Sequence, residues 1–244
     1  MKRRDFLAMT AALLPCNAMS QEAVDALRFS SLQPGAPLPA WLEPYLFPNQ
    51  PKHTRFALVE DEGRTVLAAR ADASSSGLVR RLRVDPRRFP LLAWRWKVMN
   101  LPQRGDLATR AGDDFAARIY LTFDLDPAAL SLAERMKLAL ARTLWGGQLP
   151  AAALCYVWDA RAPVGTIAPN AYTDRVQMVV AGSGRANLGR WVARERDYAA
   201  DFRQAFGMQA PLVNSVIVSA DTDNTGERTE SYFGDIEFRP RPPS

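Results

Sequence analysis

Two adjacent carboxylates are the first residues whose types could do chemistry. Asp113 and Asp114 follow a glycine and stand just before a run of alternating apolar residues. They would lie at a strand entrance, where loops held by a rigid frame carry function. A carboxylate pair can act as general acid and general base on a polysaccharide without a histidine. Consecutive residues of an extended chain point to opposite sides, so a turn must bring the two together. The alternative is that both are turn formers at a strand end.

A second set of oxygen-bearing side chains occupies residues 221–226, which read Asp-Thr-Asp-Asn-Thr-Gly. The side chains at alternate positions, Asp221, Asp223 and Thr225, supply the hard oxygen ligands that calcium prefers. The segment is not an EF-hand, because Tyr232 stands where that motif has its glutamate. The sequence therefore predicts either a small calcium site or a plain Asx-rich connection between two strands.

Alternation within the predicted strands indicates a polar sheet face. Side chains of a strand point to opposite faces in turn, and in residues 117–124 polar side chains alternate with apolar ones. Guanidinium groups bind carboxylates or phosphates through two hydrogen bonds, and tryptophan stacks on sugar rings. If the strands are neighbours, this face suits an acidic sugar; the alternative is an ordinary solvated sheet face. The expected ligand-binding residues are Arg95, Arg118, Tyr120, Trp158, Arg175 and Gln177.

Composition argues against several other kinds of site. His53 is the single histidine, so the chain has too few imidazoles for a histidine-rich zinc site. A Ser-His-Asp triad would have to use this one residue, which argues against such a triad. Of the two cysteines, only Cys155 follows the predicted export signal, so no internal disulfide is expected. The formal net charge is +5, without a Lys/Arg run that would follow phosphates, and no nucleic-acid partner is expected.

Residues 1–20 have the pattern of an export signal. Residues 2–4 are basic, residues 6–14 form a short apolar run, and small residues precede a cleavage point before Gln21. The arginine pair resembles the twin-arginine signal, with a general secretory signal as the alternative. The apolar run is shorter than the ~20 residues that span a bilayer, so no membrane span is expected. We expect a periplasmic protein whose residues 21–244 form a single domain.

The rest of the chain predicts a mainly β fold. Short β-type segments separated by Gly, Pro, Asn and Asp are typical of an antiparallel, jelly-roll-like β-sandwich. Two short helices are inserted. One, at 131–144, begins with the capping box of Ser131 and Glu134, and the other runs from Asp197 to Gly207. The predicted strands are 56–60, 65–69, 78–84, 92–98, 116–124, 153–159, 175–181, 213–221 and 231–238.

Five segments are specific when taken together. They are Trp-Arg-Trp-Lys-Val at 94–98, Gly-Asp-Asp-Phe-Ala-Ala-Arg-Ile-Tyr at 112–120, Tyr-Val-Trp-Asp at 156–159, residues 221–226, and Tyr-Phe-Gly-Asp-Ile at 232–236. In these segments the chain resembles a bacterial family of exported proteins described as a domain of unknown function, number 3047. That resemblance implies one domain and assigns no catalytic residue.

The closing strand, Gly-Asp-Ile-Glu-Phe at 234–238, is similar to the last strand of galactose-binding-like jelly rolls in carbohydrate-binding modules. This similarity implies a carbohydrate ligand at the level of fold alone. We therefore expect an exported protein that binds a polysaccharide or oligosaccharide, or another anionic envelope polymer. The alternatives are a polysaccharide-active enzyme that uses Asp113 and Asp114, and an envelope assembly or interaction protein. Calcium is the one candidate cofactor, and the sequence makes no prediction about oligomeric state.

Overall fold

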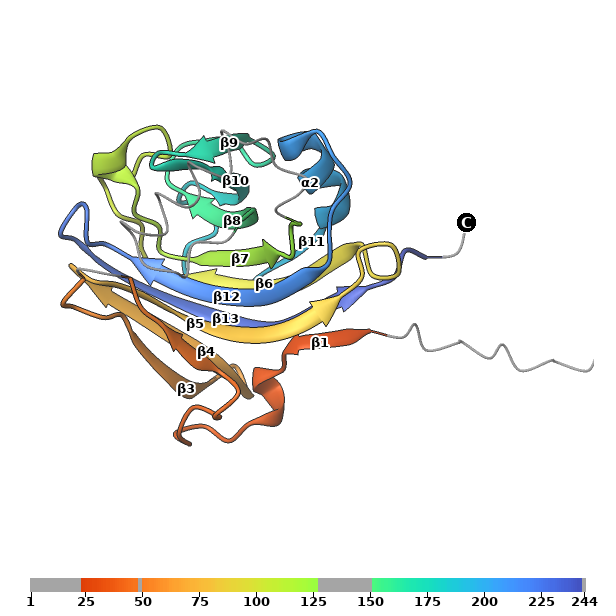
Figure 1. Ribbon diagram of the computed structural model, residues 1–244. Helices are drawn as coiled ribbons and strands as arrows, with labels where there is room; N and C mark the ends of the chain where they lie inside the picture. The colour runs from red at the N-terminus through yellow and green to blue at the C-terminus, as the bar shows by residue number, and fades with distance from the viewer. Residues whose placement is uncertain (1–22, 48–49, 127–150, 243–244) are drawn as a thin grey trace, which may run out of the picture.

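The computed structural model describes residues 23–47, 50–126 and 151–242. Within them the chain forms two β-sheets that pack face to face (Figure 1). The mainly β sandwich predicted from the sequence is thereby confirmed. The predicted export signal and the predicted helix at 131–144 lie outside the described residues.

One sheet, named sheet A, contains six strands. Five of them follow the order β11-β6-β13-β4-β3, and the sixth, β1, pairs with β13. Every pair in it is antiparallel. Its strands are β1 (Val24–Leu27), β3 (Arg55–Asp61), β4 (Arg64–Asp72), β6 (Leu91–Val98), β11 (Val192–Asp197) and β13 (Arg228–Arg239).

The other sheet, sheet B, has seven strands in the order β2-β5-β12-β7-β8-β10-β9. The pair β8 and β10 runs parallel, which differs from the fully antiparallel prediction. Parallel neighbours need a crossover, and the connecting segment here carries β9, which returns antiparallel along β10. The strands are β2 (Glu43–Tyr45), β5 (Ser75–Val84), β7 (Arg118–Phe123), β8 (Ala153–Asp159), β9 (Ile167–Asn170), β10 (Thr173–Ser183) and β12 (Val213–Asp221).

All nine predicted strands are present, and β8 and β12 have the predicted bounds. The hairpin between β3 and β4 turns through Glu62 and Gly63, both at positive φ, as a two-residue type I′ connection requires. Four strands were not predicted: β1, β2, β9 and β11. Each has six residues or fewer, and β2, β9 and β11 are sheet edges, where little apolar surface is buried and alternation is weak.

Aromatic side chains join the two sheets across the core. Trp94 of β6 lies 5.2 Å from Tyr156 of β8, and Trp96 lies 5.9 Å from Trp158, measured between ring centroids. All four rings are buried in the cluster between the sheets. Large aromatic pairs of this kind add packing energy beyond the area that they bury.

The second predicted helix is confirmed as α2 (Tyr198–Phe206). The Asp197 side chain accepts a hydrogen bond from the third residue of the helix, and Gly207 ends it in the left-handed conformation. The ring centroid of Phe202 in this helix lies 4.4 Å from that of Phe123 in β7, so the helix covers one end of the core. Two 3₁₀ turns, η1 (Phe29–Ser31) and η2 (Arg110–Gly112), complete the described helical segments.

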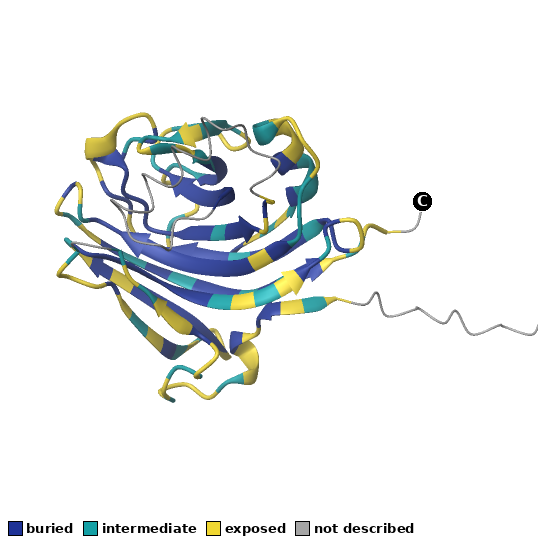
Figure 2. Ribbon diagram, viewed as in Figure 1, coloured by how far each residue is buried: buried dark blue, intermediate teal, exposed yellow. Residues whose placement is uncertain are grey.

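Sheet B is buried on both sides around β8 and β10 (Figure 2). One face packs on sheet A, and the outer face carries a second apolar cluster that includes Cys155, Met178, Phe115 and Leu107. The last two belong to the segment between β6 and β7, which therefore folds over the sheet. This cover brings loop residues against the outer face of β8 and β10, where the candidate site lies.

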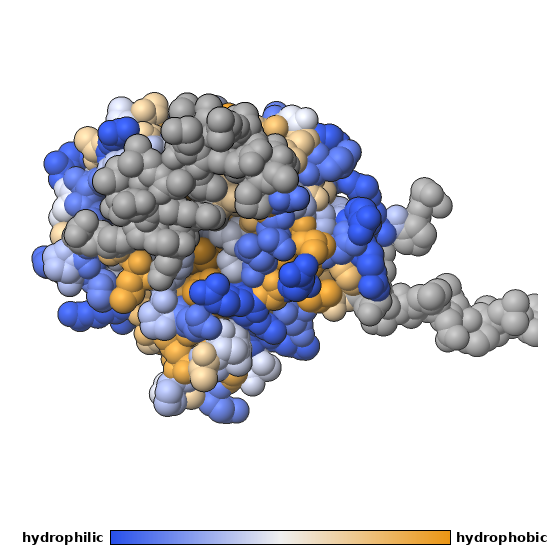
Figure 3. All heavy atoms as spheres, in the orientation of Figure 1, coloured by the Kyte–Doolittle hydropathy of each residue, from blue (hydrophilic) through white to orange (hydrophobic). Residues whose placement is uncertain are grey.

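The visible surface is mixed in character. Figure 3 shows apolar residues in small groups separated by hydrophilic ones on the face that is drawn. None of the helices in the described ranges has the length and apolar character needed to cross a bilayer.

Candidate functional site

A buried arginine ties the loop before β7 to the end of β12. Arg118, the first residue of β7, is 2% exposed. Its Nε donates to Asp221 Oδ1 at 2.9 Å, and its Nη2 lies 2.6 Å from Asp221 Oδ2. Nη1 lies 3.3 Å from Asp113 Oδ1, and the guanidinium stacks on the Phe115 ring at 4.4 Å. These contacts occupy the guanidinium, so Arg118 joins parts of the protein and is not presented to a ligand.

The turn that the adjacent carboxylates needed is present. The Asp114 amide donates to the Gly112 carbonyl oxygen at 2.7 Å, and Asp113 has φ −72° and ψ 53°, the geometry of an inverse γ-turn. Both side chains consequently reach the same buried region. Asp113 Oδ1 faces Arg118, and Asp113 Oδ2 accepts from the Asn170 amide at 3.0 Å.

Asp114 holds the loop that follows β12. Its Oδ2 accepts from the Thr225 amide at 2.6 Å, and its Oδ1 accepts from the backbone and side-chain amides of Asn224, each at 3.2 Å. Asp114 is buried. Both oxygens of Asp113 and both oxygens of Asp114 contact protein groups, so the pair orders two loops in this arrangement.

Three carboxylates from two separate sequence motifs converge here. One oxygen from each of Asp114, Asp221 and Asp223 lies within 4.8 Å of the others. Two of these residues, Asp221 and Asp223, were predicted as metal ligands, and Asp114 lies close to both. Burial raises the pKa of Asp221 to about 8 and also raises the pKa of Asp223. Ionised carboxylates this close repel one another, so the cluster has the composition of a site for a cation or for retained protons.

The hydroxyl of Thr225 has no hydrogen-bond partner among the described residues, although it is buried and its own amide contacts Asp114. An unpaired hydroxyl beside a carboxylate cluster is a neutral oxygen of the kind that calcium also takes as a ligand.

The six predicted ligand-binding residues do not form one surface. Arg95 belongs to β6 of sheet A, where its guanidinium lies 4.4 Å from the Trp191 ring centroid. Trp158 is buried in the core between the sheets. Arg118 is enclosed in the ion-pair cluster, and its outward neighbour Tyr120 packs against the second apolar cluster.

Strand β10 shows why alternation was misleading. Its residues Val176, Met178 and Val180 face the outer apolar cluster, so Arg175 and Gln177 lie on the opposite face, the one that carries the core residue Val179. The prediction assumed that the apolar half of each strand faces the sandwich. A strand that is covered on both sides has an apolar half on its outer face as well.

Cys155 sits in this outer cluster beside Tyr120. Burial raises the pKa of its thiol to about 12, which leaves it in the unreactive thiol form. Cys155 therefore packs as a small buried hydrophobe.

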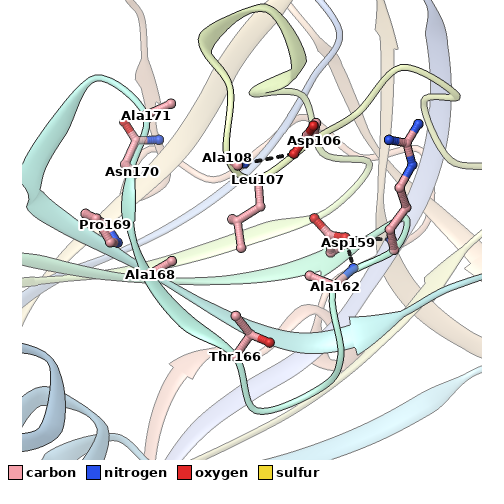
Figure 4. Close-up of a pocket in the computed structure, with 11 residues that line it drawn as sticks. Asp106, Leu107, Ala108, Asp159, Ala162, Thr166, Ala168, Pro169, Asn170 and Ala171 are labelled. Atoms are coloured by element: carbon pink, nitrogen blue, oxygen red, sulfur yellow. Dashed lines mark hydrogen bonds between the residues drawn. The ribbon is translucent and has the colours of Figure 1, made fainter.

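A pocket of about 610 Å³ opens between the covering loops and β9 (Figure 4). Its wall is mostly apolar, with a few polar side chains among small ones. It is lined by Asp106, Leu107, Ala108, Asp159, Arg161, Ala162, Thr166, Ala168, Pro169, Asn170 and Ala171. Binding sites for small molecules have this size and this mixture of surfaces.

Two residues connect the pocket to the rest of the fold. Asp159 ends β8, and its Oδ1 accepts from the amides of Arg161 and Ala162 at 2.6 and 2.5 Å, which fixes the loop behind the pocket. Asn170 lines the pocket and donates to Asp113, so the wall is joined to the buried charged cluster.

Sequence reasoning missed the pocket. Asp159 stands at the end of a correctly predicted strand and in the specific segment 156–159, but neither pattern indicates a pocket. A usable signal was the Asp-Ala-Arg-Ala sequence at 159–162, in which an aspartate can accept amides two and three residues later. Asp106 and Asn170 lie in segments for which no element was predicted, so nothing placed them near β8.

Comparisons with known proteins add the family. No curated protein matches the chain. Among solved structures, the chain is similar to a glycoside hydrolase domain of Endo-D from Streptococcus pneumoniae, at 8% identity and a TM-score of 0.35. That match covers 77% of this chain and 20% of the other, so the chain spans about a fifth of that protein's length. The model of the family described as protein of unknown function (DUF3047) matches residues 39–237, and the chain therefore belongs to this family.

Proposed function

We propose that the protein is an exported, single-domain β-sandwich that binds a carbohydrate in the pocket between β9 and the loops over sheet B. The observation that supports this proposal is the pocket itself, a hollow of about 610 Å³ with alanine and proline on its wall and a few polar side chains among them. A sugar ring has apolar faces and a polar rim of hydroxyls, and this lining offers contacts to both.

The charges of the lining favour a neutral or cationic sugar over the acidic polymer expected from the sequence. The pocket wall carries two carboxylates, Asp106 and Asp159, and one guanidinium, Arg161. The Arg161 side chain also donates to the Gln103 carbonyl at 3.1 Å. An anionic ligand would meet more negative than positive charge there.

Filling the pocket tests the proposal. Ala168 lines it and is half-buried, so Ala168→Leu adds volume inside the hollow. Ala193→Leu makes the same change at an exposed position of β11 and serves as the matched control. A glycan array followed by calorimetry should give at least tenfold weaker binding for Ala168→Leu than for Ala193→Leu. Equal binding by both variants, or no glycan bound by the wild type, would refute the proposal.

We also propose that the cluster of Asp114, Asp221 and Asp223 binds calcium as a structural ion, with Thr225 supplying a neutral oxygen. The proposal is supported by the short distances in the cluster, where one oxygen from each of the three carboxylates lies within 4.8 Å of the others. A bound cation would relieve their repulsion and fix the loop after β12.

Thermal unfolding with calcium and with EDTA tests the cation. Calcium should raise the melting temperature of the wild type, since a ligand selective for the folded state stabilises it. Asp223→Asn should lose that increase, while Asp174→Asn, at an exposed position of β10, should keep it. An identical melting temperature in calcium and in EDTA contradicts the assignment.

Export is tested by mass spectrometry of the protein from the periplasmic fraction of a bacterial host. The expected chain begins at Gln21. A full-length chain that stays in the cytoplasm contradicts the export signal.

A further inference from the structure

One carboxylate oxygen in the pocket wall is left without a partner. Asp159 is 2% exposed, and its Oδ1 takes both loop amides, from Arg161 and Ala162. Oδ2 has no hydrogen-bond partner among the described residues. Figure 4 shows that this oxygen points away from Ala162 and toward Leu107 on the other wall. An unpaired buried carboxylate oxygen is costly, so its retention needs an explanation.

The polar neighbours of Asp159 are occupied elsewhere. Asn170 gives its amide to Asp113 at 3.0 Å. The Arg161 guanidinium donates to the Gln103 carbonyl oxygen. Asp159 Oδ2 is thus an acceptor at the edge of a ligand-sized hollow, in a place where little water weakens a bond made to it.

We propose that Asp159 receives a protonated amine of the ligand, so that the pocket is selective for an amino sugar. This inference rests on the proposed carbohydrate binding and specifies its substrate class. A hydroxyl would also donate to Oδ2, but an ammonium group both donates and neutralises the carboxylate, which gives the stronger, charge-assisted bond. The second carboxylate of the wall, Asp106, adds to the same preference.

The net charge of the protein cannot by itself account for a preference for a cationic sugar. The full chain carries a formal net charge of +5, and removal of residues 1–20, with three basic residues and one acidic residue, leaves +3, so the long-range field of the processed chain repels a cationic sugar. Preference for such a sugar must therefore come from local groups.

Three oligosaccharides with the same backbone make the test. The β-1,4-linked tetramers of glucosamine, N-acetylglucosamine and glucose differ only at C2, which bears an amine, an acetamide or a hydroxyl. Calorimetry with the full processed chain should give at least tenfold tighter binding of the glucosamine tetramer than of the other two. Binding of all three with equal affinity overturns the amine assignment and leaves carbohydrate binding standing. Binding of none overturns both.

A variant locates the effect. Asp159→Asn keeps an oxygen for the two loop amides and replaces Oδ2 with a group that cannot accept. It should reduce affinity for the glucosamine tetramer at least tenfold and abolish the preference over glucose. The matched control is Asp85→Asn, at a residue that accepts the Arg87 amide in the same kind of turn but is absent from the pocket lining. Asp85→Asn should bind the glucosamine tetramer with the same affinity and the same preference over glucose as the wild type. If Asp159→Asn keeps the melting temperature and still prefers glucosamine, Asp159 is not the recognising group.

Discussion

Replacing Arg118 with methionine should destabilise the protein severely, and the structure shows why. The variant keeps the apolar stem but removes a buried guanidinium that pairs with Asp221 and Asp113. Both carboxylates would then be enclosed without their main positive partner. The sequence suggested that Arg118 is a surface residue that contacts ligand, and such a residue could be replaced with little loss of stability.

The magnitude follows from the kind of pair that is broken. Removing one partner of a buried ion pair costs roughly 3–5 kcal/mol, because the other charge remains buried and unpaired. For a domain of this size, each kcal/mol lowers the melting temperature by about 2–4 °C, so the expected drop is on the order of 10 °C. An exposed pair such as Arg81 with Glu43 contributes no more than about 1 kcal/mol.

Urea unfolding at pH 9, where Asp221 with its pKa of about 8 is ionised in the folded state, measures the difference by circular dichroism, with Arg81→Met as the matched control. Adding Asp221→Asn to Arg118→Met should recover part of the loss, since it removes one of the stranded charges. A loss below about 1 kcal/mol for Arg118→Met, equal to that of the control, would refute the structural role of this residue.

Three further predictions concern the buried interior. In EDTA the melting temperature should fall as the pH rises from 6 to 9. Burial raises the pKa of Asp221 from 3.8 to about 8, so over most of this range the folded state holds a proton that the unfolded chain has released. Asp221→Asn should make the melting temperature depend less on pH. The Cys155 thiol, with a pKa of about 12 and no exposed surface, should react with a disulfide reagent at pH 8 only after denaturant is added. Gly182→Ala should cost roughly 1–3 kcal/mol in urea unfolding, because the new Cβ would lie 2.7 Å from the Trp158 ring.

The fold could be predicted from the sequence because its central strands are long and their patterns are strong. The segment 153–159 contains Tyr, Val and Trp, the segment 213–221 is rich in the β-branched residues Val and Ile, and both strands have the predicted bounds. The helix after Asp197 carried a cap, an apolar stripe and a terminal glycine. In these segments, local preference and the packing of the core agree.

The candidate site was less predictable, because it depends on which strands are neighbours. The sequence singled out Asp114 and the loop at 221–226 separately, and their contact across the end of sheet B is a tertiary fact. The pocket depends on loops that cover a sheet face, and nothing in the pattern of β10 showed that its outer face is covered. Asp159 could be placed in its strand, but the free oxygen beside the pocket follows only from the path of the surrounding loops.

Hydrogen–deuterium exchange with and without a saturating oligosaccharide, chosen from the glycan array, tests the central claim most directly. If the sugar occupies the pocket, amides in residues 106–108 and 159–171 should exchange more slowly in its presence, while sheet A should be unchanged. Slower exchange confined to the face around Arg95 and Trp191 would contradict the account.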